Sequence, residues 1–362
     1  MDTFKWLESI PEEQRYSALK HLLIAKTRQE KVPLSASFEL TPLCNLNCQM
    51  CYVRLDKMQM EQTGKPLTAD EWISLAQEAK ELGIHNIRLT GGEAMLHEDF
   101  REIYRSIHEM GIYVDVWSNG TTINESMIDF FKKYPPANVQ VSLYGLSDEE
   151  YEKVCGNKAG YQLAMAGIHR LIGANIPCSL ATTLINESSD DFLEIHRFAK
   201  EHNLKHITGV YLHHAREDRD VDVQKLRIAP DRRIKIENDL RHIDGLAEME
   251  DCSLKRSNIS ENDIIQKGFL CGGGRNGFHI TWRGVMHTCP AFDVLKAYPV
   301  RDGLKNAWKD LVHQVDNVNA LTECQLCEYR SSCCTCAAMH YEDTKEFGKV
   351  SPTLCLKCKL KK

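Results

Sequence analysis

Short β-type runs alternate with helical stretches between residues 35 and 212, and this alternation constrains the fold more than any other feature. Strands are predicted at 36–40, 86–90, 112–118, 138–144, 178–183 and 206–211. A capping box, Thr68-Ala69-Asp70-Glu71, opens one of the helices between them. Gly83, Gly111 and Gly173 end three helices, as left-handed caps require. Six consecutive βα units predict an α/β fold with a parallel sheet, either open and doubly wound or curved into a barrel.

The segments on either side have other patterns. Residues 1–34 indicate one or two amphipathic helices, which we expect to cover the α/β domain as a lid. Residues 213–267 are dense in charge and predict a bridging segment with one helix over 230–244. Most of that charge is expected to face solvent. With the cysteine-rich end of the chain, the pattern predicts four parts, 1–34, 35–212, 213–267 and 268–362.

Composition narrows the class of protein. The net charge is −6, whereas a general nucleic-acid binder carries a stripe or patch of basic residues. No apolar run has the length of a membrane span, and the first residues lack the layout of a secretory signal. We therefore expect a cytoplasmic protein with reduced thiols and without nucleic-acid or membrane partners. Its 15 cysteines are an odd number, which fits a disulfide framework poorly and favours metal binding.

Three cysteines, Cys44, Cys48 and Cys51, lie in the loop directly after the first predicted strand. At these spacings the three sulfurs can face one centre if the loop curls around it. Three thiolates bind three irons of a [4Fe–4S] cluster and leave the fourth iron open to a ligand that is not protein. A zinc site would need a fourth protein ligand close by, and this loop has no histidine.

The CxxxCxxC spacing followed by the aromatic Tyr52 resembles the signature of the radical S-adenosylmethionine (radical SAM) superfamily. That resemblance implies a partial (β/α)6 barrel of the TIM type. It also implies that a reduced cluster passes an electron to S-adenosylmethionine, which releases a 5′-deoxyadenosyl radical that abstracts hydrogen from a substrate. Leu89-Thr90-Gly91-Gly92-Glu93 ends the second predicted strand. In the family this element receives the amino group of the cofactor, with a carboxylate that pairs with an ammonium. The positions implied to contact the cofactor are Tyr52, Gly91, Gly92, Glu93, Ser118, Asn119 and Ser142.

The cysteines near the C-terminus form a second pattern. Cys271 precedes a predicted β-hairpin with Gly284 in its turn, which would return Cys289 towards Cys271. The remaining cysteines of this part are Cys324, Cys327, Cys333, Cys334, Cys336, Cys355 and Cys358. Zinc ribbons also use CxxC pairs, so spacing alone leaves a zinc site open.

The same spacing resembles the SPASM extension of radical SAM enzymes, a small cysteine-rich domain that binds two auxiliary [4Fe–4S] clusters. The resemblance implies a distal cluster on Cys324, Cys327, Cys333 and either Cys355 or Cys358. It implies a proximal cluster on Cys271, Cys289 and one of Cys334 and Cys336, with an iron left open if only three cysteines bind. The family usually places its sixth cysteine where this chain has Ala337. We expect Cys155, Cys178 and Cys252, and the pair His213 and His214, to be structural.

Most SPASM proteins modify peptides or proteins. The expected function is therefore to install a crosslink or another oxidative modification in a ribosomally made precursor peptide. The implied partners are that peptide and a flavodoxin- or ferredoxin-type electron donor. Only 34 residues precede the first strand, so recognition of the precursor is expected to need another surface of the chain or a separate protein. Asp293 and Tyr144 are suggested as the base that removes the substrate proton.

Three alternatives stay open at this point. One is a maturase that makes formylglycine in sulfatases, but such enzymes carry Asp directly after the matching cysteine, where this chain has Pro290. A second is a radical SAM enzyme that acts on a small substrate other than a peptide. A third, of another class, is a protein that binds an iron–sulfur cluster or zinc without catalysis.

Overall fold

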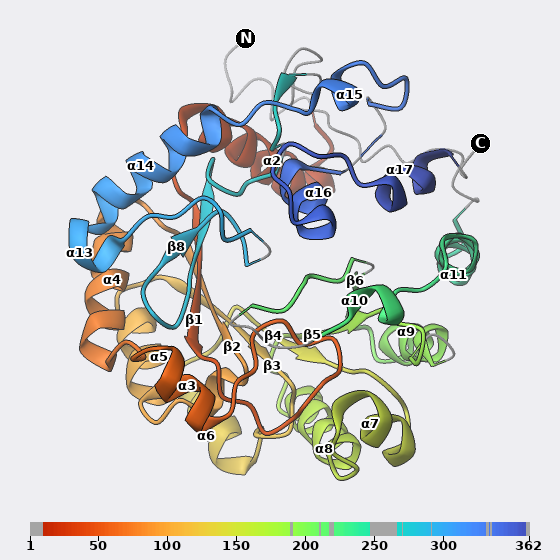
Figure 1. Ribbon diagram of the computed structural model, residues 1–362. Coiled ribbons are helices and arrows are strands. Elements are labelled where there is room, and N and C mark those ends of the chain that lie inside the picture. Colours follow the sequence, from red (N-terminus) through yellow and green to blue (C-terminus); the bar gives the residue numbers. More distant parts are fainter. Residues whose placement is uncertain are drawn as a thin grey trace.

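A computed structural model describes residues 10–188, 191–209, 211–216, 221–246, 266–269, 271–290, 292–330, 333 and 335–359. Its centre is one eight-stranded sheet in the order β6-β5-β4-β3-β2-β1-β7-β8 (Figure 1). The strands are β1 Ser35–Thr41, β2 Asn86–Gly91, β3 Tyr113–Ser118, β4 Asn138–Ser142, β5 Cys178–Thr183, β6 Lys205–Gly209, β7 Gly277–Ile280 and β8 Met286–His287.

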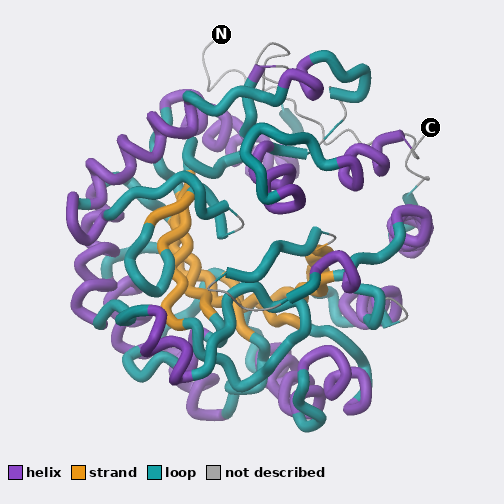
Figure 2. Tube along the Cα trace, in the orientation of Figure 1, coloured by secondary structure: helices purple, strands orange, loops and turns teal. Residues whose placement is uncertain are grey.

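The first six strands are all parallel and follow one another in chain order across the sheet. A doubly wound sheet reverses its strand order at a switch point, and this sheet has no such reversal. The fold is therefore a partial barrel of six parallel strands, and the barrel alternative is confirmed. Figure 2 shows the strands on the inside of a curved arc of helices.

Helices cover the outer face of the sheet. Those of the barrel are α3 Lys57–Thr63, α4 Ala69–Glu81, the 3₁₀ turn η1 Ala94–Leu96, α5 Phe100–Glu109, α6 Glu125–Lys133, α7 Asp148–Cys155, α8 Gly160–Gly173 and α9 Phe192–Glu201. Alternate residues of β1 pack against them, as where the rings of Phe38 and Trp72 lie 5.0 Å apart. The other face of each strand therefore points into the barrel.

The turn chemistry of these helices matches the sequence in all but one case. Thr68 and Glu71 form the predicted capping box of α4. Gly83 and Gly111 have φ of 88° and 79°, the left-handed conformation of helix caps. The prediction for Gly173 is wrong: it is the last residue of α8, and Asn175 takes the left-handed conformation with φ of 54°. Asparagine tolerates this conformation better than other residues with a Cβ, so it competes with glycine for such positions.

The N-terminal helix α2 spans Glu12–Glu30. Its apolar residues do not form the buried stripe predicted for them, since Tyr16, Leu19 and Leu23 are 78%, 48% and 45% exposed. The helix contacts the rest of the chain near its C-terminal end, where the side chain of Asn276 donates to the hydroxyl of Thr27 over 3.1 Å. The part of the predicted helical segment before residue 10 lies outside the described residues.

The C-terminal part begins with the predicted hairpin. β7 pairs in parallel with β1 and antiparallel with β8, and Gly284 in the turn has φ of 77°. The helices that follow are α13 Pro299–Asp302, α14 Leu304–Asp316, α15 Thr322–Gln325, α16 Ala337–Thr344 and α17 Pro352–Lys359. A small second core forms here from Phe269, Phe292, Val315, Val318, Ala337 and Ala338. In Figure 1, α15, α16 and α17 lie on one side of the barrel, away from α5 and α6.

The bridging segment contains α10 Val223–Leu226 and α11 Pro230–Ile243, the latter within one residue of the prediction. It is tied to α16 by side chains. Arg227 pairs with Asp343, both nearly buried, and just before the segment the hydroxyl of Tyr211 donates to the carbonyl of Met339 over 2.9 Å. In the part of the chain that is described, no helix combines the length and the apolar character needed to cross a membrane.

Candidate active site

The loop after β1 curls so that its three cysteines face one region. Backbone N–H groups of Leu46 and Arg54 donate to the sulfurs of Cys44 and Cys51 over 3.4 and 3.3 Å. The loop is held from outside by α7, because Asn47 N–H donates to the carbonyl of Cys155 over 2.8 Å. Burial, with smaller contributions from nearby Glu93, Cys48 and Cys51, raises the pKa of the Cys44 thiol to about 12, although the backbone N–H of Leu46 lowers it. Three partly buried thiols that face one region need a metal centre to hold them as thiolates.

Glu93, at the end of β2, is completely buried and accepts four hydrogen bonds. Its carboxylate receives the hydroxyl of Ser118 (3.0 Å), the backbone N–H of Asn119 (2.7 Å), the backbone N–H of Met95 (3.3 Å) and the hydroxyl of Thr122 (3.4 Å). Burial raises its pKa to about 7, although these hydrogen bonds lower it. A cation brought to this carboxylate would therefore find a strong and poorly solvated partner.

The carboxylate and the cysteine loop are joined through Asn119. Its side-chain amide lies 3.5 Å from the sulfur of Cys44 and donates to the side chain of Asn45 over 2.9 Å. Asn119 follows β3, so the ends of β1, β2 and β3 meet here. In parallel α/β folds this carboxyl end of the strands is the usual place for a ligand.

The two glycines before Glu93 allow the end of β2 to lie close to the backbone of the cysteine loop. A Cβ on Gly91 would lie 2.4 Å from the carbonyl oxygen of Thr41, and one on Gly92 would lie 2.4 Å from that of Leu43. Gly91 also has a φ of 156°, at the edge of the range that glycine alone adopts freely. The residues that hold the loop and the carboxylate are thus in direct backbone contact.

Tyr144 and Ser142 lie at the end of β4. Tyr144 hydrogen-bonds to the Ser142 side chain and lies partly buried near Cys48. Burial raises the pKa of Tyr144, so its phenol stays protonated at neutral pH and can serve as a hydrogen-bond donor. Asp293, the other suggested base, is exposed and lies beside Tyr341 and Glu342.

Tyr52 connects the cysteine loop to a buried charged group that sequence reasoning missed. Arg216 lies over the Tyr52 ring, 5.4 Å from its centre, and forms an ion pair with Glu39. His279 of β7 lies 3.3 Å from the same carboxylate. Burial alone would raise the pKa of Glu39, but Arg216 and His279 together lower it to about 2. Glu39 and His279 face into the barrel, and the period-two pattern of β1 is the signal that could have shown this for Glu39.

Tyr52 also lies near two groups of cysteines. Burial raises the pKa of Tyr52, and the nearby charges of Glu39, Cys51 and Cys289 add to that rise. Cys289 packs on the small second core together with Cys336. Burial and the neighbouring thiol of Cys271 together raise the pKa of Cys336 to about 11. The structure thus brings Cys271, Cys289 and Cys336 to one region, on the barrel side of the C-terminal part.

A separate region gathers four other cysteines. Burial and the neighbouring thiols of Cys355, Cys333 and Cys327 together raise the pKa of Cys324 to about 11, although Arg330 lowers it. Cys334, Cys252 and the side chain of Cys358 lie outside the described residues. Cys155 lies in the main core, as expected of a structural thiol, and Cys178 packs against that core.

Within the described ranges, no three Cys, His, Asp or Glu side chains are placed to hold a single metal ion. An iron–sulfur cluster spaces its thiolates more widely, because each one binds a different iron. The donor chemistry of the three cysteine groups, all sulfur, fits such a cluster.

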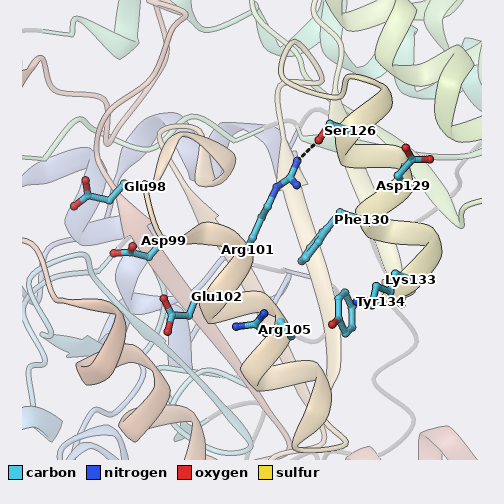
Figure 3. A pocket seen from close by; sticks show the side chains of 10 residues that line it. All are labelled: Glu98, Asp99, Arg101, Glu102, Arg105, Ser126, Asp129, Phe130, Lys133 and Tyr134. Atoms are coloured by element: carbon cyan, nitrogen blue, oxygen red, sulfur yellow. Dashed lines mark hydrogen bonds between the residues drawn. The ribbon is translucent and has the colours of Figure 1, made fainter.

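One hollow lies away from these groups, on the outer face of the barrel between α5 and α6 (Figure 3). It has a volume of about 600 Å³. Arg101 donates to the hydroxyl of Ser126 over 2.8 Å and lies 5.3 Å from the ring centre of Phe130. Acidic and basic side chains are mixed along its walls, so the hollow favours no particular ligand charge.

Comparison with known proteins agrees with this geometry. Residues 38–199 match the family model of the Radical SAM superfamily. The sporulation killing factor maturation protein SkfB of Bacillus subtilis (strain 168) is 34% identical over 160 residues, which are 44% of this chain and 38% of SkfB. The PqqA peptide cyclase of Rhizobium meliloti (strain 1021) is 22% identical over 322 residues, 85% of this chain and 83% of the cyclase. The match to SkfB thus spans less than half of that protein.

Among solved structures, SuiB of Streptococcus suis superposes with a TM-score of 0.70 at 17% identity, over 95% of this chain and 82% of SuiB. The same protein with S-adenosylmethionine or with the precursor peptide SuiA bound gives TM-scores of 0.66 and 0.67. At this identity the likeness establishes the fold. The chain is thus related to the radical SAM enzymes of the SPASM peptide maturase group, with the family match lying in residues 38–199.

Proposed function

We propose that this chain is a peptide maturase that uses a [4Fe–4S] cluster on Cys44, Cys48 and Cys51 together with S-adenosylmethionine. The observation that carries the proposal is the hydrogen-bonded link from the sulfur of Cys44 through Asn119 to the buried carboxylate of Glu93. It puts a thiol group for iron and an anionic site for an ammonium side by side at the carboxyl ends of the strands.

The residues of the chain have separate tasks in this account. Glu93 pairs with the ammonium of the cofactor, while Ser118 and Asn119 hold the carboxylate in place. Gly91, Gly92, Tyr52 and Ser142 shape the remaining cofactor site. When bound, the cluster and S-adenosylmethionine supply one-electron cleavage and a radical able to abstract hydrogen. The barrel orients the substrate and excludes water.

The C-terminal cysteines are assigned to two auxiliary clusters. The distal set is Cys324, Cys327, Cys333 and Cys355. The proximal set is Cys271, Cys289 and Cys336. Their gathering in two separate regions supports this division. The proximal set lies nearer Tyr52 than the distal set does. A cluster on the proximal set is therefore the one suited to take an electron from a substrate in the barrel.

A peptide is the proposed substrate because the relatives named above are a killing-factor maturation protein, a peptide cyclase and a protein solved with its precursor peptide. The modification would be a crosslink or another oxidation of an unactivated carbon. The reducing electron would come from a flavodoxin or ferredoxin, and a separate protein would assist in recognising the precursor. Pro290 after Cys289 argues against the formylglycine alternative.

The test is anaerobic reconstitution followed by co-incubation with peptides encoded in short reading frames beside this gene. We expect about 12 irons per chain, compared with about 4 if only the first cluster is present. We also expect the peptide to lose hydrogen atoms, measured by mass spectrometry, only when S-adenosylmethionine and a reductant are added. A chain with full iron that consumes the cofactor but modifies only small molecules would contradict the peptide substrate.

A further inference from the structure

His340 of α16 faces the sulfur of Cys324, and both its ring nitrogens have defined neighbours. The ring is buried, with only 2% of the residue exposed. Its Nε2 lies 3.5 Å from the Sγ of Cys324, and its Nδ1 accepts the backbone N–H of Ser351 over 3.1 Å. No sequence motif pointed to this residue.

These two contacts fix where the proton of the ring sits. A backbone amide can only donate, so Nδ1 must present its lone pair to Ser351. A neutral imidazole carries one N–H, which must then be on Nε2. The N–H therefore points at the sulfur of Cys324. The same assignment prevents Nε2 from binding a metal, because a metal would need the lone pair that the proton occupies.

The surrounding hydrogen bonds hold this arrangement in place. Thr344 donates its hydroxyl to the carbonyl of His340 over 2.9 Å, which fixes this turn of α16. The hydroxyl of Ser351 bonds to Asp343 and accepts the backbone N–H of Leu354 over 3.2 Å. Ser351 thus contacts the His340 ring with its amide and supports the start of α17, which carries Cys355, with its hydroxyl. Ser351 therefore helps to fix the orientation of the His340 ring and the position of Cys355, a proposed cluster ligand.

We propose that His340 donates an N–H···S hydrogen bond to Cys324 in the distal auxiliary cluster and so raises the reduction potential of that cluster. The proposal rests on the distal cluster of the proposed function. Reduction adds negative charge to the cluster and its thiolates, so a donor at sulfur stabilises the reduced form more than the oxidised form. His340 acts through Cys324 and is therefore a positioning residue rather than a catalytic one.

The test uses reconstituted protein in which Cys44, Cys48 and Cys51 are replaced by Ala, so that only auxiliary clusters remain. Potentials are measured by redox titration followed by electron paramagnetic resonance. In His340→Phe we expect one of the two potentials to become more negative, with the reduction equilibrium changed roughly tenfold, about 59 mV for one electron. His340→Gln retains an N–H donor and should recover part of the shift. The matched control is His313→Phe, an exposed histidine on α14 that should leave both potentials unchanged.

Other outcomes separate this proposal from the proposed function. If the parent protein binds no auxiliary iron, the distal cluster itself is wrong. If it binds both clusters and His340→Phe leaves both potentials unchanged, the hydrogen bond has no effect and the inference is overturned. If His340→Phe loses iron, two further measurements decide whether His340 is an iron ligand or a hydrogen-bond donor. They are the potential of His340→Gln and pulsed electron paramagnetic resonance of protein labelled with ¹⁵N-histidine. A strongly coupled nitrogen would show that His340 is a direct ligand and overturn the inference, whereas a weak coupling with a shifted potential in His340→Gln would support it.

Discussion

The side-chain amide of Asn119 lies 3.5 Å from the sulfur of Cys44, although 75 residues separate them in the chain. The same residue donates its backbone N–H to Glu93 over 2.7 Å. Asn119 therefore couples the two parts of the site. A displacement of the cysteine loop moves the Glu93 carboxylate, and a displacement of the carboxylate moves the loop.

Replacing Asn119 by Ala should weaken binding of S-adenosylmethionine about fivefold, because one hydrogen bond near a buried charge contributes about 1 kcal/mol. Anaerobic equilibrium dialysis of the reconstituted protein measures the dissociation constant. The matched control is Asn317→Ala on α14, whose amide bonds locally to His313 and which should leave the constant unchanged. Equal constants for Asn119→Ala and the parent would mean that this link does not support the site.

Binding of the cofactor should weaken in acid. The pKa of Glu93 is raised to about 7, so the carboxylate takes up a proton as pH falls through this value and loses its attraction for an ammonium. From about pH 8 to about pH 6 we expect the affinity for S-adenosylmethionine to fall about tenfold. In Glu93→Gln the affinity should be low and flat with pH. A parent protein with flat affinity over this range would refute the pairing.

The same shift has a consequence for stability without cofactor. A carboxyl whose folded pKa is raised favours folding below its ordinary pKa of 4.5 and loses that contribution as pH rises towards about 7. The free energy of unfolding of the cofactor-free parent should therefore fall across this range more than that of Glu93→Gln. Urea titrations of both proteins at several pH values make the comparison, and identical slopes would contradict it.

Glu39 should behave in the opposite sense. Its pKa is lowered to about 2, so its contribution to stability is present above 4.5 and is lost as pH falls towards about 2. At neutral pH, Glu39→Gln should destabilise the fold by about 3 kcal/mol, because the charge of Arg216 stays buried without its carboxylate. Glu346→Gln, at an exposed ion pair with Lys349, is the control and should change stability by less than about 1 kcal/mol. A loss at Glu39 no greater than at Glu346 would show that the buried pair is not stabilising.

Two glycines offer a further matched pair. Gly92→Ala places a Cβ 2.4 Å from the carbonyl oxygen of Leu43, so the cysteine loop must move, and we expect the iron of the first cluster to be lost. Gly173→Ala meets nothing within 4 Å in α8 and should stabilise the fold by up to about 1 kcal/mol. Iron analysis and thermal unfolding check both variants. Normal iron in Gly92→Ala would show that the loop tolerates the displacement.

Sequence reasoning predicted the six parallel strands because their apolar periodicity and helix caps are local signals. It failed where packing between distant segments decides. The exposed Tyr16 and Leu19 of α2 are of this kind. The left-handed Asn175 in place of Gly173 is a local error instead, because asparagine competes with glycine for helix caps. The group of Glu39, Arg216 and His279 was missed because its members come from three separate segments that only the barrel brings together. The contact between His340 and Cys324 was missed for the same reason, since it depends on a tautomer fixed by Ser351.

The central claim is that Cys44, Cys48 and Cys51 hold the cluster that cleaves S-adenosylmethionine. The most direct test is the amount of 5′-deoxyadenosine formed anaerobically by the reconstituted protein with a strong reductant, with the triple Cys→Ala variant beside it. We predict 5′-deoxyadenosine from the parent and none from the variant, while the variant still carries the iron of its auxiliary clusters. No 5′-deoxyadenosine from an iron-loaded parent, or equal amounts from both proteins, would contradict the account.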